Sequence, residues 1–148
     1  MLTTEVTPRL LAAEILECTP RIMYFIRREI RRQLKGSSLP QVRVLAFLSR
    51  SPGATLSLLA ESLGVTKATA SNLTDKLVQR GWVNRIEDPN ERRCVLLSLT
   101  EEGEKQFRKA NDMAVLELSQ ILINVPPGKL RKIYEGVSAL RAVCEVEI

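Results

Sequence analysis

The hydrophobic residues near the N-terminus recur at the spacing of one face of an α-helix. Thr7-Pro8 and Thr19-Pro20 each place a hydroxyl before a proline, an arrangement typical of the first turn of a helix. Because the apolar stripe continues across Thr19-Pro20, the pattern predicts a helix over 7–35 in two pieces that meet at a kink rather than at a full break. The stripe consists of Leu11, Ile15, Cys18, Ile22, Phe25 and Ile26.

The rest of the chain predicts more helices and a single β-hairpin. Ser51-Pro52-Gly53 is typical of a turn, and the polar segment 88–93 separates two β-like runs. Thr100 supplies a capping hydroxyl, and acidic residues follow it at the positive end of the helix dipole. The expected elements after 7–35 are a helix over 40–49, two short helices within 56–79, strands at 82–87 and 94–99, a helix over 100–123, and a last helix after Val125-Pro126-Pro127-Gly128.

The segment from Leu56 to Asp75 has the register of a helix-turn-helix. Ala60 provides the small residue where the two helices cross, and Gly64 provides the turn residue that tolerates a positive φ. Two amphipathic helices around a glycine also occur by chance, but here every constrained position agrees. The positions that fill the angle between the helices are all apolar: Leu59, Leu63, Val65, Ala70 and Leu73.

The second of these helices has the polar outer face of a DNA recognition helix. Thr66 caps it, and on a helical wheel Ala70, Leu73 and Leu77 point inward. Asn72 suits adenine and Lys67 suits guanine or phosphate, whereas ordinary solvent exposure is the competing interpretation for each residue alone. The candidate DNA-binding residues of this helix are Thr66, Lys67, Ala68, Thr69, Ser71, Asn72 and Lys76.

The hairpin that follows predicts a second DNA contact. Its polar tip carries adjacent arginines, which can enter a narrow and strongly negative minor groove. Asp88 or Glu91 is expected to hold an arginine in place. The strands are expected to anchor the hairpin through Val83, Ile86, Val95, Leu97 and Leu99. The candidate DNA-binding residues of this wing are Asp88, Asn90, Arg92 and Arg93.

The two ends of the chain are long amphipathic helices that a small middle domain cannot cover. A second copy of the chain is the simplest partner for their apolar stripes, so we expect a homodimer. The predicted fold class is mainly α (α+β), a winged helix-turn-helix with long N- and C-terminal dimerisation helices. The predicted domains are a dimerisation region at 1–38, a DNA-binding domain at 39–100 and C-terminal dimerisation helices at 101–148.

Composition favours a DNA-binding protein and disfavours an enzyme. Lys and Arg total 22 against 17 acidic residues, which gives a net charge of +5 and an isoelectric point near 9.4. The chain has no histidine and three cysteines, so catalysis by a Ser–His or Cys–His pair is excluded and a cysteine-cluster zinc site is disfavoured. No glycine-rich phosphate loop is present, and we expect no cofactor. With no long apolar run and no signal peptide, we expect a cytoplasmic protein.

Two stretches of sequence resemble the MarR family of bacterial and archaeal regulators. They are LPQVRVLAFL, from Leu39, and LAESLGVTKATASNLTDKLVQRGWVNRIEDPNERRCVLLSLTEEG, from Leu59. The resemblance implies a dimer with intertwined terminal helices, recognition helices at 66–80, wings at 82–99 and an inverted-repeat operator. It further implies repression that a small aromatic or phenolic compound relieves by binding between the dimer and DNA-binding parts.

The wing matches the family pattern only in part. Asp88 and Arg92 correspond to its acid–arginine pair, and Arg93 adjoins them. Asn90 stands where many members have another arginine, and Glu91 replaces the commoner aspartate, so the wing departs from the family pattern at these two positions.

Three alternative functions compete with regulation by a ligand. Some members of the family sense oxidants through a cysteine in the first helix, which makes Cys18 a candidate redox residue. The competing interpretation is that Cys18 is a small buried hydrophobic residue. A winged helix that binds only protein is disfavoured by the basic residues of the recognition helix and wing. An appendage of an enzyme is disfavoured because little chain remains for a catalytic domain.

Overall fold

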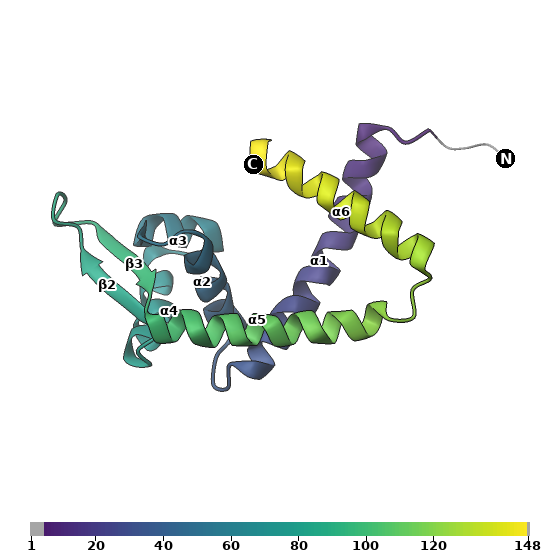
Figure 1. Cartoon of the computed structure of the whole chain (residues 1–148). Helices are drawn as coiled ribbons and strands as arrows, with labels where there is room; N and C mark the ends of the chain where they lie inside the picture. The colour runs from purple at the N-terminus through teal and green to yellow at the C-terminus, as the bar shows by residue number, and fades with distance from the viewer. Residues whose placement is uncertain (1–4, 148) are drawn as a thin grey trace. The chain divides into compact units, whose positions relative to one another are not determined.

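The computed structural model describes residues 5–147, which form helices and one small antiparallel sheet (Figure 1). This confirms the predicted mainly α fold with a winged helix-turn-helix. Internal contacts divide the chain into two compact units, one up to Ala114 and the other from Val115. The elements are α1 (Pro8–Gln33), α2 (Leu39–Arg50), β1 (Ala54–Thr55), α3 (Leu56–Leu63), α4 (Lys67–Gln79), β2 (Val83–Glu87), β3 (Val95–Leu99), α5 (Glu101–Leu122) and α6 (Pro127–Glu147).

Helix α1 is continuous, which corrects the expectation of two pieces. Its predicted cap at Thr7 is confirmed, because the amide of Leu10 donates to Thr7 Oγ1 at 3.2 Å. The predicted cap at Thr19 is wrong, since Thr19 and Pro20 both lie inside the helix. A proline removes only its own amide donor, and the residues on either side retain theirs, so the lost hydrogen bond does not end the helix.

The first unit has its hydrophobic core among α2, α3, α4 and the sheet, and buried residues of α1 and α5 extend it. Leu45, Leu59, Leu77 and Leu97 are completely shielded from solvent. Helix α2 begins with a reciprocal cap in which the Ser38 amide donates to Gln41 Oε1 and the Gln41 amide donates to Ser38 Oγ. Tight packing around α2 fixes the position of the helices that follow it.

The sheet has the strand order β1-β3-β2, and both pairings are antiparallel. Sequence patterning missed β1, because a strand of two residues carries no alternation. The expectation that Ile86 anchors the hairpin is wrong, since its side chain is 57% exposed whereas Val83 is buried. Positions 83 and 86 are three residues apart, and side chains alternate along a strand, so the two residues point to opposite faces.

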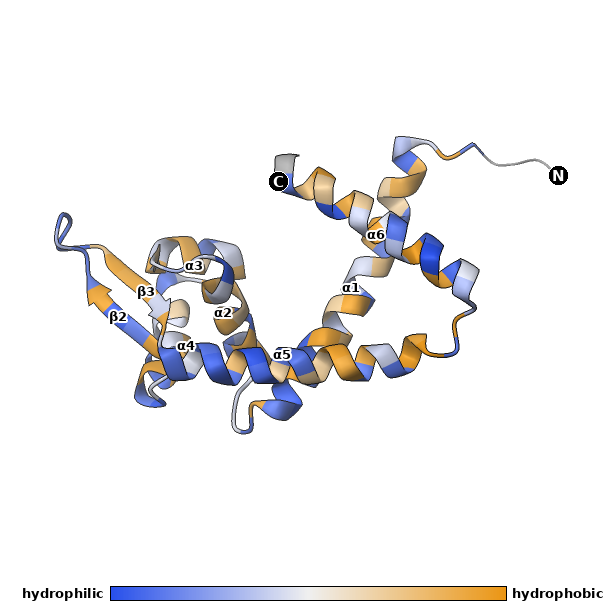
Figure 2. Ribbon diagram, in the orientation of Figure 1, coloured by the Kyte–Doolittle hydropathy of each residue, from blue (hydrophilic) through white to orange (hydrophobic). Residues whose placement is uncertain are grey.

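The second unit contains the end of α5 and all of α6, and none of its described side chains is buried. Figure 2 shows hydrophobic positions recurring along α6. No helix within residues 5–147 combines the length and apolar character that crossing a membrane requires. The exposed large hydrophobic residues of this unit are Val115, Leu116, Ile121, Ile123, Leu130, Ile133, Tyr134, Val137, Leu140 and Val143.

Candidate nucleic-acid interface

The turn between α3 and α4 has the geometry predicted for a helix-turn-helix. Gly64 adopts the left-handed conformation with φ of 68°, and the Val65 amide donates to the Ala60 carbonyl at 3.0 Å. Ala60 is 4% exposed, as expected for a residue at the helix crossing. The carbonyl of Leu63, at the end of α3, accepts a hydrogen bond from Arg43 Nη2 at 3.2 Å. The turn is therefore held both by its own backbone and by a side chain of α2.

The N-terminus of α4 is capped and exposed. The Thr66 hydroxyl accepts from the Thr69 amide at 3.2 Å and lies 3.0 Å from the Thr69 hydroxyl, so both threonines take part in the cap. The outer face is polar and accessible, whereas Ser71 is half-buried. Thr74, which sequence analysis did not single out, is fully buried and donates to the Ala70 carbonyl. The exposed candidate residues of α4 are Lys67, Ala68, Thr69, Asn72 and Lys76.

A side chain of the wing contacts the recognition helix directly. Arg85 on β2 places its Nη1 atom 2.8 Å from Asp75 Oδ1 and 3.1 Å from Ser71 Oγ. Arg85 is absent from the predicted DNA-binding set because its partners lie 10 and 14 positions earlier in sequence. The contact joins the hairpin to α4, and it pairs an acid on the outer face of that helix with a positive charge.

The wing tip is a polar loop whose two arginines are exposed. Figure 2 shows the tip as hydrophilic, and Figure 1 shows it projecting beyond α3. Asp88 Oδ1 accepts from the Asn90 amide at 2.9 Å, so the carboxylate organises the loop. The expected ion pair of Asp88 or Glu91 with an arginine is not formed in the described part of the chain. The Asp88 carboxylate instead accepts from the backbone amide of Asn90, and the side chains of Arg92 and Arg93 form no ion pair within the described residues.

Arg80, at the end of α4, has a structural role. Its guanidinium carbon lies 3.7 Å from the centre of the Trp82 ring. Its nitrogens donate to Ser37 Oγ at 2.7 Å and to the Lys35 carbonyl at 2.9 Å. A planar guanidinium can stack and donate in its plane at the same time. Arg80 thus joins the end of α4 to the loop between α1 and α2.

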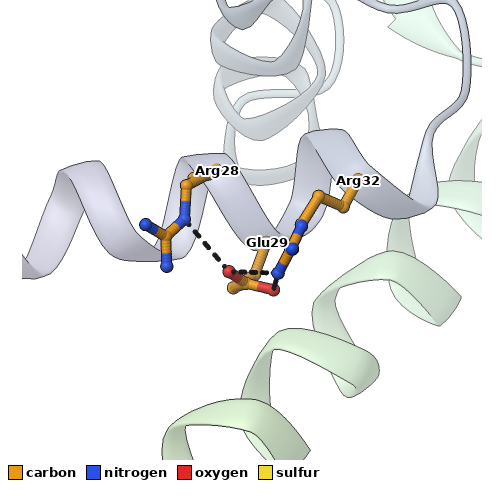
Figure 3. Close-up of polar contacts among 3 residues, drawn as sticks. All are labelled: Arg28, Glu29 and Arg32. Carbon is orange, nitrogen blue, oxygen red and sulfur yellow. Dashed lines mark hydrogen bonds and ion pairs between the residues drawn. The ribbon is translucent and has the colours of Figure 1, made fainter.

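Basic residues recur between positions 27 and 35, around the end of α1, and an acid neutralises part of this charge. Glu29 is 4% exposed and lies between Arg28 and Arg32, whose guanidinium groups point toward its carboxylate (Figure 3). The nearest nitrogen–oxygen distance is 3.2 Å for each arginine. Burial by itself would raise the pKa of Glu29, but hydrogen bonds from Arg32 and Arg28 outweigh it, and the net pKa is lowered.

A cavity of about 540 Å³ lies within the first unit, among residues of α1, α2, α3, β3 and α5. Phe47 and Phe107 contribute aromatic walls, and four arginines line it against a single acid, Glu104, among the described residues. Burial, followed by the positive charges of Arg43 and Arg50, lowers the pKa of Arg27 below its ordinary value. The arginines of the cavity are Arg27, Arg43, Arg50 and Arg108.

The cysteines form no disulfide. Cys18 is exposed in this chain, so the expectation that it is buried on the apolar stripe is not met within one copy of the protein. Cys94 and Cys144 are half-buried. No second thiol adjoins Cys18 in sequence, and its redox role stays a prediction.

The helix-turn-helix and the projecting basic hairpin together define a winged helix-turn-helix protein of the class that binds duplex DNA. The model of the MarR family matches residues 38–95. An uncharacterised HTH-type transcriptional regulator of Bacillus subtilis, YfiV, is 32% identical over 108 residues, which are 73% of this chain and 68% of that protein. The chain belongs to the MarR family of DNA-binding transcriptional regulators, and this class confirms the expectation that it is not an enzyme.

Two further similarities concern the fold and a short stretch of sequence. The crystal structure of Rv1404 from Mycobacterium tuberculosis is similar to this fold, with a TM-score of 0.73, 22% identity and coverage of 96% of this chain and 97% of that one. The transcriptional repressor MprA of Escherichia coli is 41% identical over 51 residues, which are 34% of this chain and 29% of MprA. The likeness to Rv1404 shows a shared fold, and the match to MprA covers less than a third of that repressor.

Proposed function

We propose that this protein is a repressor that acts as a homodimer on an inverted-repeat operator and responds to a small ligand. The observation that carries this proposal is the joining of an exposed recognition helix to an exposed basic wing through Arg85, Asp75 and Ser71. A wing held in one orientation allows the two elements to bind adjacent grooves together.

Helix α4 reads base edges in the major groove with its N-terminal half. Asn72 pairs with adenine, and Lys67 reaches guanine or a phosphate, while the helix N-terminus itself attracts phosphate. Arg92 and Arg93 enter the minor groove, where they respond to its width. Asn90 is polar but uncharged, so we assign it a weaker contact than the arginines beside it.

Dimerisation is supported by the second unit, which has no buried side chain among those described. An α-helix in water draws most of its stability from packing an apolar face, so α6 needs a partner surface. A second copy supplies that surface, together with the amphipathic part of α1. Two-fold symmetry then sets the recognition helices about 34–36 Å apart, which predicts half-site centres about 10 base pairs apart.

Repression and release by a ligand are supported by two observations. MprA, a relative over 51 residues, is a transcriptional repressor. The cavity of the first unit combines aromatic walls with arginines, which fits a small aromatic compound that carries a negative charge. A regulator of this kind acts where the chromosome is, so we assign the protein to the cytoplasm.

The proposal is tested by selecting bound duplexes from a random pool and by measuring the mass of the free protein in solution. We expect a dimer and an enriched inverted repeat. Arg92→Ala should weaken binding to the selected duplex and flatten its dependence on salt, because one phosphate-region contact per protomer is lost. Arg131→Ala, which removes the same charge from an exposed position of α6, is the control. A monomer, or a pool without enrichment at low salt, would contradict the proposal.

A further inference from the structure

The cavity of the first unit adjoins the helix-turn-helix, because Ser62 and Leu63 of α3 line it together with Arg43. This residue of α2 lines the cavity, and its Nη2 atom donates to the carbonyl of Leu63 at 3.2 Å. Leu63 is the last residue of α3 and precedes the turn glycine, Gly64. Arg43 therefore joins the lining of the cavity to the end of α3, next to the turn that positions α4.

The carbonyl of Leu63 depends on this donor. The last four carbonyls of a helix have no partner within it, and an arginine at that end also interacts favourably with the helix dipole. The amides of Gly64 and Val65 turn back to the carbonyls of Ala60 and Glu61 rather than to that of Leu63. Removal of the guanidinium would leave the part-buried Leu63 carbonyl without this hydrogen-bond donor. The loss would occur at the point where the chain changes direction between α3 and α4.

The cavity is built to take an anion. Arg27 and Arg43 are half-buried, and burial, followed by the positive charges of Arg43 and Arg50, lowers the pKa of Arg27. Glu104 is the single acid among the described lining residues, so most of this positive charge has no partner at the cavity. A carboxylate would relieve the repulsion, and an aromatic ring would fill the space beside Phe47 and Phe107.

We propose that Arg43 couples the cavity to DNA binding, by exchanging its hydrogen bond to the Leu63 carbonyl for one to an aromatic carboxylate. The inference rests on the proposed function, because it requires that the protein binds DNA and a ligand. The ligand draws the guanidinium into the cavity, the end of α3 loses its donor, and the turn no longer holds α4 in the orientation that fits DNA. A ligand shifts an equilibrium only by its differential affinity for the two states, and here Arg43 supplies that difference.

The variant Arg43→Met tests the coupling, since it keeps an unbranched apolar side chain and removes every donor. The Kd for the selected operator duplex is measured without and with saturating 2-hydroxybenzoate, at constant ionic strength because DNA binding responds to salt. For the wild type we expect the probe to raise the Kd about tenfold, within the usual range of allosteric coupling. For Arg43→Met we expect a raised Kd without the probe and a ratio near one with it.

Arg108→Gln is the matched control, because Arg108 lines the same cavity from α5 and makes no hydrogen bond to residues 63–66. It should bind the probe more weakly but retain the full ratio at saturation. Titration calorimetry of the probe, with and without DNA, gives the reciprocal ratio that linkage requires. If Arg43→Met does not fold, Arg43→Lys replaces it. Lysine keeps the charge but lacks the planar fork, so the ratio should again fall.

The outcomes separate the coupling from the proposed function. A wild type that ignores DNA overturns the function. A wild type that binds DNA but neither binds 2-hydroxybenzoate nor changes its Kd overturns the coupling alone. The coupling is also overturned if Arg43→Met has the DNA affinity of the wild type without the probe, or if it keeps the wild-type ratio.

Discussion

Gly103 lies where the first turn of α5 meets the start of the wing, and its replacement by alanine should disrupt that contact. A Cβ at position 103 would overlap the Trp82 carbonyl oxygen and would lie 2.8 Å from the Trp82 carbonyl carbon. The atoms in the way belong to the backbone, so no rotamer change relieves the overlap. The same carbonyl accepts the amide of Thr100 at 3.0 Å, and Thr100 in turn caps α5 through Gly103.

The expected loss follows from three contributions. Overpacking a tight site costs about 1–3 kcal/mol, and weakening the Thr100–Trp82 hydrogen bond costs about 1 kcal/mol. Alanine inside a helix gains about 1 kcal/mol over glycine. We therefore expect Gly103→Ala to lower the free energy of unfolding by about 2 kcal/mol. For a chain of this length the loss corresponds to a fall of roughly 4–8 °C in Tm.

Thermal unfolding at one fixed protein concentration measures this effect, because the Tm of a dimer depends on concentration. Gly136→Ala is the matched control, since Gly136 lies inside α6 and an added Cβ has no neighbour within 4 Å among the described residues of the same chain. The control should be at least as stable as the wild type, by virtue of the same gain in helix propensity. If Gly103→Ala matches Gly136→Ala, the steric reasoning for the contact between α5 and Trp82 is wrong.

Three other predictions concern the DNA interface and acid stability. Asn72→Ala should cost about 1–3 kcal/mol of operator binding and relax the preference at one base of each half-site, as competition with variant duplexes would show. Asp75→Asn should raise DNA affinity and Arg85→Ala should lower it. Each substitution should change the free energy of unfolding by less than about 1 kcal/mol, because the pair is partly exposed. Equal effects of the two substitutions on DNA affinity would argue against the neutralisation of Asp75 by Arg85. The lowered pKa of Glu29 means that its ion pairs stabilise the fold fully above pH 4.5 and lose this effect as the pH falls through the lowered pKa. In acid unfolding experiments, Glu29→Gln should reduce the loss of stability over that pH range. A dependence of stability on pH equal to that of the wild type would contradict this prediction.

The helix-turn-helix could be predicted from sequence because its constraints are local. Ala60, Gly64 and the apolar positions around them lie within one short segment, and each has a steric reason for its residue type. The wing hairpin was predictable for the same reason, since its polar tip separates two β-like runs. The prediction from local spacing that Ile86 anchors the hairpin was wrong, because this branched hydrophobic residue of the strand points to solvent rather than to the core.

The contacts that join distant segments could not be predicted. Arg85, Arg80 and Arg43 are indistinguishable in sequence from solvent-facing arginines, yet each bonds a residue between 10 and 45 positions away. One partial signal was present, because Asp75 is an acid on a helix face expected to meet DNA. An acid in that position requires a neutralising partner, and the nearest basic residue of the following strand is Arg85.

These contacts also change what the net charge means for DNA binding. Arginines engaged with Glu29, Trp82, Asp75 and the Leu63 carbonyl have structural roles, so the total of +5 does not measure the charge available to phosphates. Binding to B-DNA weakens with salt in proportion to the phosphate contacts made, with a slope near 0.9 for each contact. If a dimer uses only the exposed cations of its recognition helices and wings, the slope cannot exceed about 7 in magnitude. The side chains that set this limit in each protomer are Lys67, Lys76, Arg92 and Arg93.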